Sequence, residues 1–175
     1  LLADLRVDVG LQDVDGWSVL MLAASCGHAE VVQAVLADPR VNTNALNRAQ
    51  WVALMYASCN GHLDVIEALL ADSRVDLQAQ QEDGWTTLMY AAFNGEVEIV
   101  RRLLARGADP NTRCHAGKTA IIYAFLSALY PPLRWDDEIT PSRRKGCFDC
   151  IDLLLAYPGI DVSDFEQIRL PELEA

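Results

Sequence analysis

Apolar residues recur along this chain with the spacing of helices. In the stretch LMYAAFNGEVEIVRRLL, Leu88, Ala91 and Ala92 have the i, i+3, i+4 spacing that places side chains on one helix face. A polar, turn-rich segment, RGADPNTRCHAG, follows and separates this stretch from the next apolar one. The pattern predicts two antiparallel helices joined at Gly95 and followed by a projecting turn. The apolar stripe of the second helix consists of Val97, Ile99, Val100, Leu103 and Leu104.

The same pattern returns with a period of 34 residues. Tryptophan recurs at this spacing, and so does the glycine after the first helix. A period of this length is typical of stacked supersecondary units, none of which can bury its apolar face alone. The period therefore predicts a solenoid with a core that continues between units. The repeated positions are Trp17, Trp51 and Trp85, and Gly27, Gly61 and Gly95.

The repeated motifs resemble the ankyrin repeat. GWTTLMYAA, GHLDVIEALL and RGADPN carry the match, and the resemblance covers almost the whole chain. It implies an all-α ankyrin-repeat solenoid of stacked helix pairs with projecting β-turns. It also implies a non-enzymatic module that binds a partner protein or peptide. The tetratricopeptide repeat has the same period, but its Trp, Gly and Tyr positions differ and it lacks the Gly-His turn.

We expect one domain, residues 1–175, with about four repeats and a partial one before them. Residues 1–12 are expected to end a preceding repeat, because LLADLRVD copies LLADSRVD from Leu69. A start inside a repeat suggests a fragment of a longer array. Full repeats are expected at 13–46, 47–80 and 81–113, and a fourth at 114–162. The acidic segment 163–175 would either cap the last apolar face or act as a linker.

The second repeat departs from the pattern at its turn. Gln50 stands where the other repeats have Gly16, Gly84 and Gly117. A positive φ angle would cost a residue other than glycine about 1 kcal/mol or more. We therefore expect this turn to have a different shape.

The fourth repeat contains a long insertion. Four positions separate Ala23 from Gly27, but 22 separate Ala124 from Gly146, so 18 residues are inserted within about 126–145. The first helix is expected to continue until the two prolines after Tyr130 stop it. The insertion contains Trp135, and it is either a second contact with a partner or a tolerated loop.

Charge and composition narrow the partners. With 14 Lys and Arg against 25 Asp and Glu, the formal net charge is −11. Nucleic acid is therefore a poor partner, and a protein with a basic face is a better one. No run is long enough to span a membrane, so no membrane insertion is expected. The five cysteines are not spaced like a disulfide framework, which favours a reducing, intracellular compartment. We expect a cytoplasmic protein or a secreted effector that acts inside a host cell, and in either case a monomer.

The sequence contains no catalytic constellation and predicts no cofactor. The motif from Cys147 to Cys150 could in principle hold zinc or act in redox chemistry. Its register argues against this. Cys147 falls where other repeats have His28 and His62, and Cys150 falls at a core position, so we predict no metal site.

The resemblance also implies where a partner would bind. In this family the residue after the turn glycine, and the two before the Gly-His turn, line the concave groove. Trp135 is an additional candidate from the insertion. The three tryptophans with Phe93 would form an aromatic ladder of binding anchors; alternatively, each Trp packs on the next turn and was copied by duplication. When these family positions are matched to the present sequence, the groove residues are Trp17, Ser25, Cys26, Trp51, Cys59, Asn60, Trp85, Phe93, Asn94 and Lys118.

Two other functions remain open from the sequence. The chain could be a regulatory or targeting segment of a larger enzyme or secreted effector. It could also sense a small ligand or an oligonucleotide, since aromatic ladders can stack bases. The acidic charge argues against the latter, because only Arg48 and Lys118 would supply positive charge to the groove.

Overall fold

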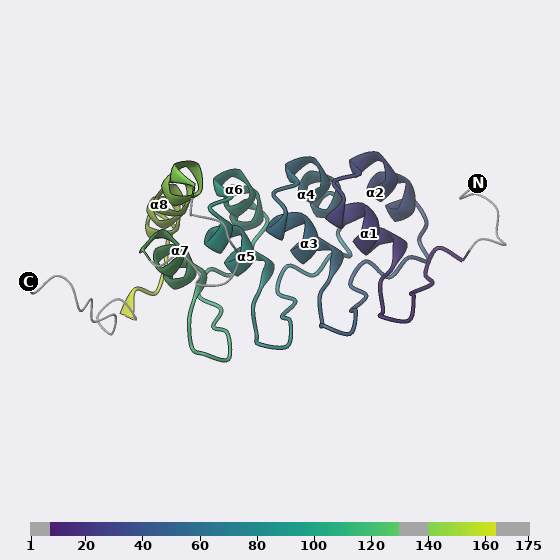
Figure 1. The fold of residues 1–175 in the computed structure, drawn as a ribbon, viewed down its shortest axis with the longest axis horizontal. Coiled ribbons are helices and arrows are strands. Elements are labelled where there is room, and N and C mark those ends of the chain that lie inside the picture. The colour runs from purple at the N-terminus through teal and green to yellow at the C-terminus, as the bar shows by residue number, and fades with distance from the viewer. Residues whose placement is uncertain (1–7, 130–139, 164–175) are drawn as a thin grey trace, which may run out of the picture.

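Four helix pairs are stacked side by side in this computed structural model, which describes residues 8–129 and 140–163. The first helices of the pairs form one row and the second helices form another, and the turns project from the side of the first row (Figure 1). The predicted all-α solenoid is confirmed, and the described residues contain no strand longer than an isolated bridge. The pairs are α1 (Val19–Ser25) with α2 (Ala29–Leu36), α3 (Ala53–Cys59) with α4 (Leu63–Leu70), α5 (Thr87–Asn94) with α6 (Val97–Ala105), and α7 (Ala120–Leu129) with α8 (Pro141–Leu155).

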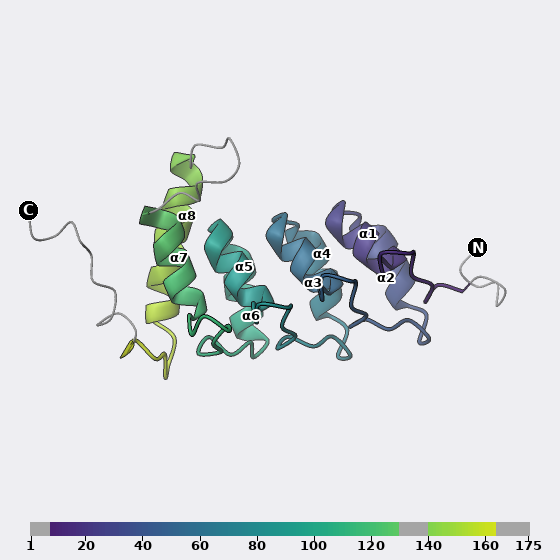
Figure 2. The same ribbon diagram turned by 60° about the horizontal axis from the view of Figure 1, so that its bottom comes forward.

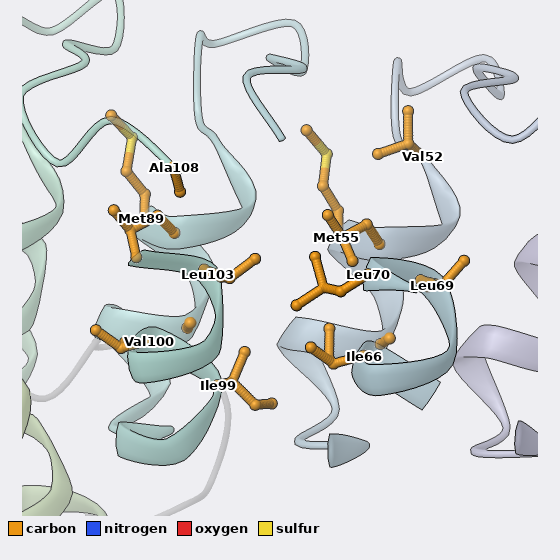
Figure 3. Close-up of a cluster of buried hydrophobic side chains, with 14 of the residues drawn as sticks. Val52, Met55, Ile66, Leu69, Leu70, Met89, Ile99, Val100, Leu103 and Ala108 are labelled. Carbon is orange, nitrogen blue, oxygen red and sulfur yellow. The ribbon is translucent and has the colours of Figure 1, made fainter. Parts of the chain in front are cut away.

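The core runs without interruption from one pair to the next. Helix α1 packs on α3, α3 on α5 and α5 on α7, and the second helices pack on one another in the same order. Figure 3 shows the repetition: Met55 and Ile66 in the second pair occupy the same places as Met89 and Val100 in the third. All four side chains are buried. Ala91 is also fully buried on α5, and its small side chain lets neighbouring first helices approach closely.

No helix in the described part of the chain is both long enough and apolar enough to span a membrane.

The first helices begin with caps that differ between repeats. In the third repeat the hydroxyl of Thr86 accepts a hydrogen bond from the N–H of Met89 at 3.3 Å, and the Met89 sulfur accepts one from the N–H of Thr86 at 3.5 Å. Ser18 caps α1 in the same way. Val52 stands at this position in the second repeat and has no hydroxyl, so α3 begins without a side-chain cap.

The second turn has the same backbone conformation as the turns that contain glycine. The φ angle of Gln50 is 62°, close to 83° at Gly16 and 81° at Gly84. The expectation of a differently shaped turn was therefore wrong. The reason is that the turn hydrogen bond is kept: the N–H of Gln50 donates to the carbonyl of Asn47 at 2.9 Å, as Gly84 does to Gln81 at 2.8 Å.

Glycine also lets the next turn approach closely. A Cβ atom on Gly84 would lie 2.9 Å from the backbone nitrogen of His115. At this junction the N–H of His115 donates to the carbonyl of Asp83 at 2.9 Å. The second turn, which contains Gln50, meets the third turn at Ala49 and Glu82. In the described residues no matching backbone hydrogen bond joins these two residues. The second and third turns are therefore joined less tightly than the third and fourth.

The fourth pair differs most from the others, and it stands taller than they do in Figure 2. Helix α8 has 15 residues, whereas α2 and α4 have 8 each. It begins at Pro141, before Gly146, where the repeat pattern resumes, and the hydroxyl of Thr140 caps it by accepting the N–H of Arg143 at 3.2 Å. Within the expected insertion, residues 126–129 complete α7 and 141–145 form the start of α8. Residues 130–139, including Trp135, lie outside the described residues.

Gly146 is not the turn glycine that its sequence position suggests. It lies within α8, and a Cβ atom there would collide with the carbonyl oxygen of Gly95. A Cβ atom on Gly95 would lie 2.7 Å from the carbonyl oxygen of Arg143. Backbone therefore meets backbone where α8 crosses the end of α5, and two glycines make this crossing possible.

Replacing Gln50 with Gly should raise the free energy of unfolding by about 1 kcal/mol, because it removes the strain of a positive φ angle. It should also allow the missing bond between turns to form. Urea denaturation measures the change. Gln33→Gly, at an exposed position of α2, is the matched control and should lower stability by about 1 kcal/mol. A Gln50→Gly protein no more stable than the wild type would contradict the assigned turn geometry.

Replacing Gly146 with Ala should lower the free energy of unfolding by about 2 kcal/mol, because the new methyl group has no space beside Gly95. An ordinary helical glycine shows the opposite sign, a gain of about 0.5–1 kcal/mol on replacement by Ala. Ser142→Ala, exposed on the same helix, is the control and should change stability by less than about 0.5 kcal/mol. If Gly146→Ala proves stabilising, α8 does not cross α5 at this point.

Candidate functional site

A continuous series of aromatic rings runs along the turns and first helices of all four repeats. We call it the aromatic ladder. Tryptophans and tyrosines alternate in it. Tyr56 and Tyr90 each lie between the Trp of their own repeat and that of the repeat before, and Tyr123 lies beside Trp85 of the repeat before. Successive ring centroids are 4.4, 4.8, 4.5, 5.0 and 3.8 Å apart. The ladder consists of Trp17, Tyr56, Trp51, Tyr90, Trp85 and Tyr123.

Each Trp is positioned by the turn before it. The carboxylate of Asp13 accepts hydrogen bonds from the N–H groups of Asp15 at 2.9 Å and Trp17 at 2.8 Å. In the second repeat the side-chain oxygen of Asn47 accepts the N–H of Trp51 at 2.9 Å in the same way. These bonds fix the backbone on both sides of the first two turns, from which Trp17 and Trp51 leave. In the third turn, among the residues that the structure describes, the side chain of Gln81 accepts only the N–H of Asp83, at 2.6 Å.

Each Tyr is held at its hydroxyl as well as at its ring. The hydroxyl of Tyr56 accepts a hydrogen bond from the side-chain amide of Asn47 at 2.6 Å. The hydroxyl of Tyr123 lies 3.2 Å from the sulfur of Cys114, which occupies the corresponding place in the fourth repeat. Burial raises the pKa of both Tyr90 and Tyr123, so these hydroxyls are neutral at physiological pH. The rings are therefore fixed before any partner arrives.

The ladder is only partly covered by protein. The three tryptophans, Tyr56 and Tyr90 are half-buried, and Tyr123 is 9% exposed. The rings thus pack on one another, and all of these residues except Tyr123 remain partly accessible to solvent. Both interpretations of the Trp series therefore have support, since each Trp packs against the fold and also remains accessible.

The sequence analysis missed the tyrosines. Tyr56 and Tyr90 are 34 residues apart, the same period as the tryptophans, and Tyr123 follows 33 residues later. This recurrence was the available signal. At the matching position of the first repeat stands Leu22, which is 50% exposed.

The predicted residues beside the Gly-His turns link neighbouring repeats. The side-chain amide of Asn60 donates to the carbonyl of Ser25 at 2.9 Å, and Asn94 donates to the carbonyl of Cys59 at 3.1 Å. The side chain of His62 also contacts the carbonyl of Ser25, at 3.0 Å. These groups hold the first helices together, and their amides are already engaged within the protein.

An open hollow lies where the third repeat meets α8. Burial raises the pKa of Glu96 in this hollow, whereas the nearby charge of Arg143 and that of His62 act in the opposite direction. The guanidinium of Arg143 lies 5.1 Å from the ring centroid of Phe93, which in turn lies 5.6 Å from Trp85. The hollow has a volume of about 390 Å³ and is lined by Cys59, Asn60, Asn94, Gly95, Glu96, Thr140, Ser142 and Arg143.

The other predicted site residues lie outside this hollow. Cys26 is exposed at the end of α1. Lys118 is half-buried in the fourth repeat, at the position that Trp occupies in the first three. The structure therefore gathers Cys59, Asn60 and Asn94 around the hollow, next to Phe93.

The two cysteines of the Cys-x-x-Cys motif are buried in α8. The sulfur of Cys147 lies 3.6 Å from the carbonyl of Phe93, the kind of contact that His62 makes two repeats earlier. Burial raises the pKa of Cys147 and raises that of Cys150 to about 12. In the described residues no three His, Cys, Asp or Glu side chains are grouped so that they could hold a metal ion.

These environments predict unequal thiol reactivity. At pH 8, the exposed Cys26 should react rapidly with a thiol reagent. In the folded protein Cys147 and Cys150 should react at least about 100-fold more slowly than they do in protein unfolded by urea, because the thiolate is the reactive form and burial disfavours it. Mass spectrometry of the labelled peptides measures each rate. The unfolded protein is the control for intrinsic reactivity. Rapid labelling of Cys150 in the folded protein would contradict its burial.

Comparison with known proteins agrees with this architecture. The family model described as ankyrin repeats (3 copies) matches residues 1–81 and 72–131. A search of curated proteins gave no match. Ankyrin repeats are generally protein–protein interaction modules and are typically non-enzymatic. Since the family model matches well over half of its length, this chain belongs to the ankyrin repeat family.

Proposed function

We propose that this chain binds a partner protein through the face formed by its turns and first helices, with the aromatic ladder as the main contact. The observation that carries the proposal is the continuity of the ladder across four repeats, in which the three tryptophans, Tyr56 and Tyr90 remain partly accessible to solvent. Half-buried Trp and Tyr are the residue types that most often dominate the binding energy of interfaces. A row of such residues can act along the whole array.

The ladder is also ready to bind without rearrangement. Asn47 holds the hydroxyl of Tyr56, and the ring of Trp51 packs against both Tyr56 and Tyr90, so these rings have little rotational freedom left to lose. Side chains that are ordered in advance reduce the entropic cost of association. The fold thus supports affinity as well as contact area.

Charge supports a partner with a basic face. The formal net charge is −11, and acidic residues occupy the turn tips, where Asp15 is exposed and pairs with Arg48 at 3.2 Å. Glu82 and Asp83 are exposed at the third turn. Such a surface speeds the encounter with a basic partner and makes the affinity depend on salt.

The start of α8 is proposed as a second contact. Pro141, Arg144, Lys145 and Phe148 border a hollow of about 380 Å³, and Phe148 is 44% exposed. These residues belong to or adjoin the insertion that the sequence analysis singled out together with Trp135. This surface is basic, unlike the turn tips, so it suits an acidic part of the partner.

The sequence left two other functions open. The sensing of a small ligand or an oligonucleotide is less well supported than protein binding, whereas a regulatory or targeting role is compatible with it. Base stacking by an oligonucleotide is disfavoured, because the ladder rings face one another and the chain is acidic. A regulatory or targeting role within a larger enzyme or effector would use the same binding surface.

Replacing Trp51 with Ala should weaken partner binding by about 1–3 kcal/mol, because it removes the central anchor of the ladder. It should also lower stability by about 1–2 kcal/mol, since Trp51 contacts both Tyr56 and Tyr90. Affinity capture from cell lysate identifies the partner, and calorimetry with the purified partner measures its affinity.

Val31→Ala, at an exposed position of α2 away from the ladder, is the matched control. Circular dichroism establishes that each variant is folded. Equal affinity of folded Trp51→Ala and wild-type protein would exclude the ladder as the main contact and move attention to α8.

A further inference from the structure

The ladder has a fixed spacing that restricts the shape of its occupant. The rings of Trp17 and Trp51 lie 4.4 and 4.8 Å from the ring of Tyr56, so the two indoles cannot be more than about 9.2 Å apart, the sum of these distances. For Trp51 and Trp85, at 4.5 and 5.0 Å from Tyr90, the limit is about 9.5 Å. Helices that pack side by side are about 8–10 Å apart, so we expect equivalent side chains of neighbouring repeats to lie at about this distance. We therefore expect equivalent indoles to lie about 8–9.5 Å apart.

Few backbone conformations present the same face at this spacing. A β-strand repeats its face about every 6.6 Å and then at about 13 Å. An α-helix returns to the same face after three or four residues, at about 4.5–6 Å, and after seven, at about 10.5 Å. A polyproline II helix repeats its face every three residues, which is about 9.3 Å. Only the polyproline II repeat falls within the range set by the indoles.

The indoles also offer donors that such a segment can use. The side-chain N–H groups of Trp17 and Trp51 have no hydrogen-bond partner among the residues that the structure describes, and they are not buried. A polyproline II segment makes no internal hydrogen bonds, so its carbonyl groups remain free to accept. Carbonyls three residues apart would meet successive indoles in the same register.

We propose that the aromatic ladder binds a proline-rich segment in the polyproline II conformation, with Lys or Arg beside the prolines. The segment contacts Trp17, Trp51 and Trp85 through residues i, i+3 and i+6. Proline-rich segments dock in aromatic-lined grooves because they are already extended and lose little entropy on binding. We place Lys or Arg beside the prolines of this segment because the neighbouring turn tips, including Asp15 and Asp83, are acidic. This inference rests on the proposed binding role of the ladder and specifies the class of its partner.

Three labelled peptides test the inference. The first has ten prolines followed by two lysines. The second replaces the prolines with an alternating Gly-Ser sequence and keeps the charge, and the third keeps the prolines and replaces the lysines with glutamates. Fluorescence anisotropy should show the first peptide binding at least about tenfold more tightly than the second, and more tightly than the third.

Nuclear magnetic resonance locates the contact. The chain has four tryptophans, so a ¹⁵N-labelled sample gives at most four indole N–H signals, which single Trp→Phe substitutions assign. Titration with the first peptide should shift the signals of Trp17, Trp51 and Trp85. Trp51→Phe keeps a ring and loses the donor, and it should weaken binding at least about threefold. Val31→Ala, at an exposed position of α2 away from the ladder and from the start of α8, should leave binding unchanged.

The outcomes separate this inference from the proposed function. Equal binding of the Gly-Ser peptide, or no shift of the ladder indoles, would overturn the polyproline II inference. If a captured partner protein then still depended on Trp51, the ladder would remain a binding surface for a partner of another shape. If that dependence were also absent, both proposals would fail.

Discussion

The packing of each repeat on its neighbour is the interaction on which the rest of the structure depends. A single pair of short helices, such as α3 and α4, cannot cover both of its apolar faces by itself. Met55 and Ile66 become fully buried only because this pair lies between two neighbouring pairs. Small residues such as Ala91 set how closely the first helices approach. The same distance then becomes the spacing of every feature that recurs once in each repeat.

The aromatic ladder is a direct consequence of this constraint. The second and third repeats each contain one Trp and one Tyr, but the continuous series requires Tyr56 to enter the space between Trp17 and Trp51. The ladder is therefore a property of the stack. Residues with a structural role and residues with a proposed binding role need not be different ones here, because the same rings join the repeats and most of them remain partly accessible to solvent.

Sequence periodicity was sufficient for the helix pairs and for the tryptophan row, because both recur at one spacing. It failed at Gln50, where the hydrogen bond to Asn47 maintains a conformation that local preference disfavours. It also failed at Gly146, which matches the turn glycines in sequence but lies inside α8. That helix begins in a charged segment, Ser142 to Lys145, which has no apolar stripe to reveal it. The tyrosines were detectable from their period and were overlooked.

The fourth repeat connects the two proposed contact surfaces. Trp85 touches Phe93, and the guanidinium of Arg143 lies over the same ring, so contact continues from the ladder to the first turn of α8. Charge changes along this path, from the acidic turn tips to Arg144 and Lys145. A partner that follows the ladder and reaches α8 would therefore meet opposite charges at its two ends. Such a surface distinguishes the two directions in which an extended segment can lie, a distinction that the rings alone cannot make.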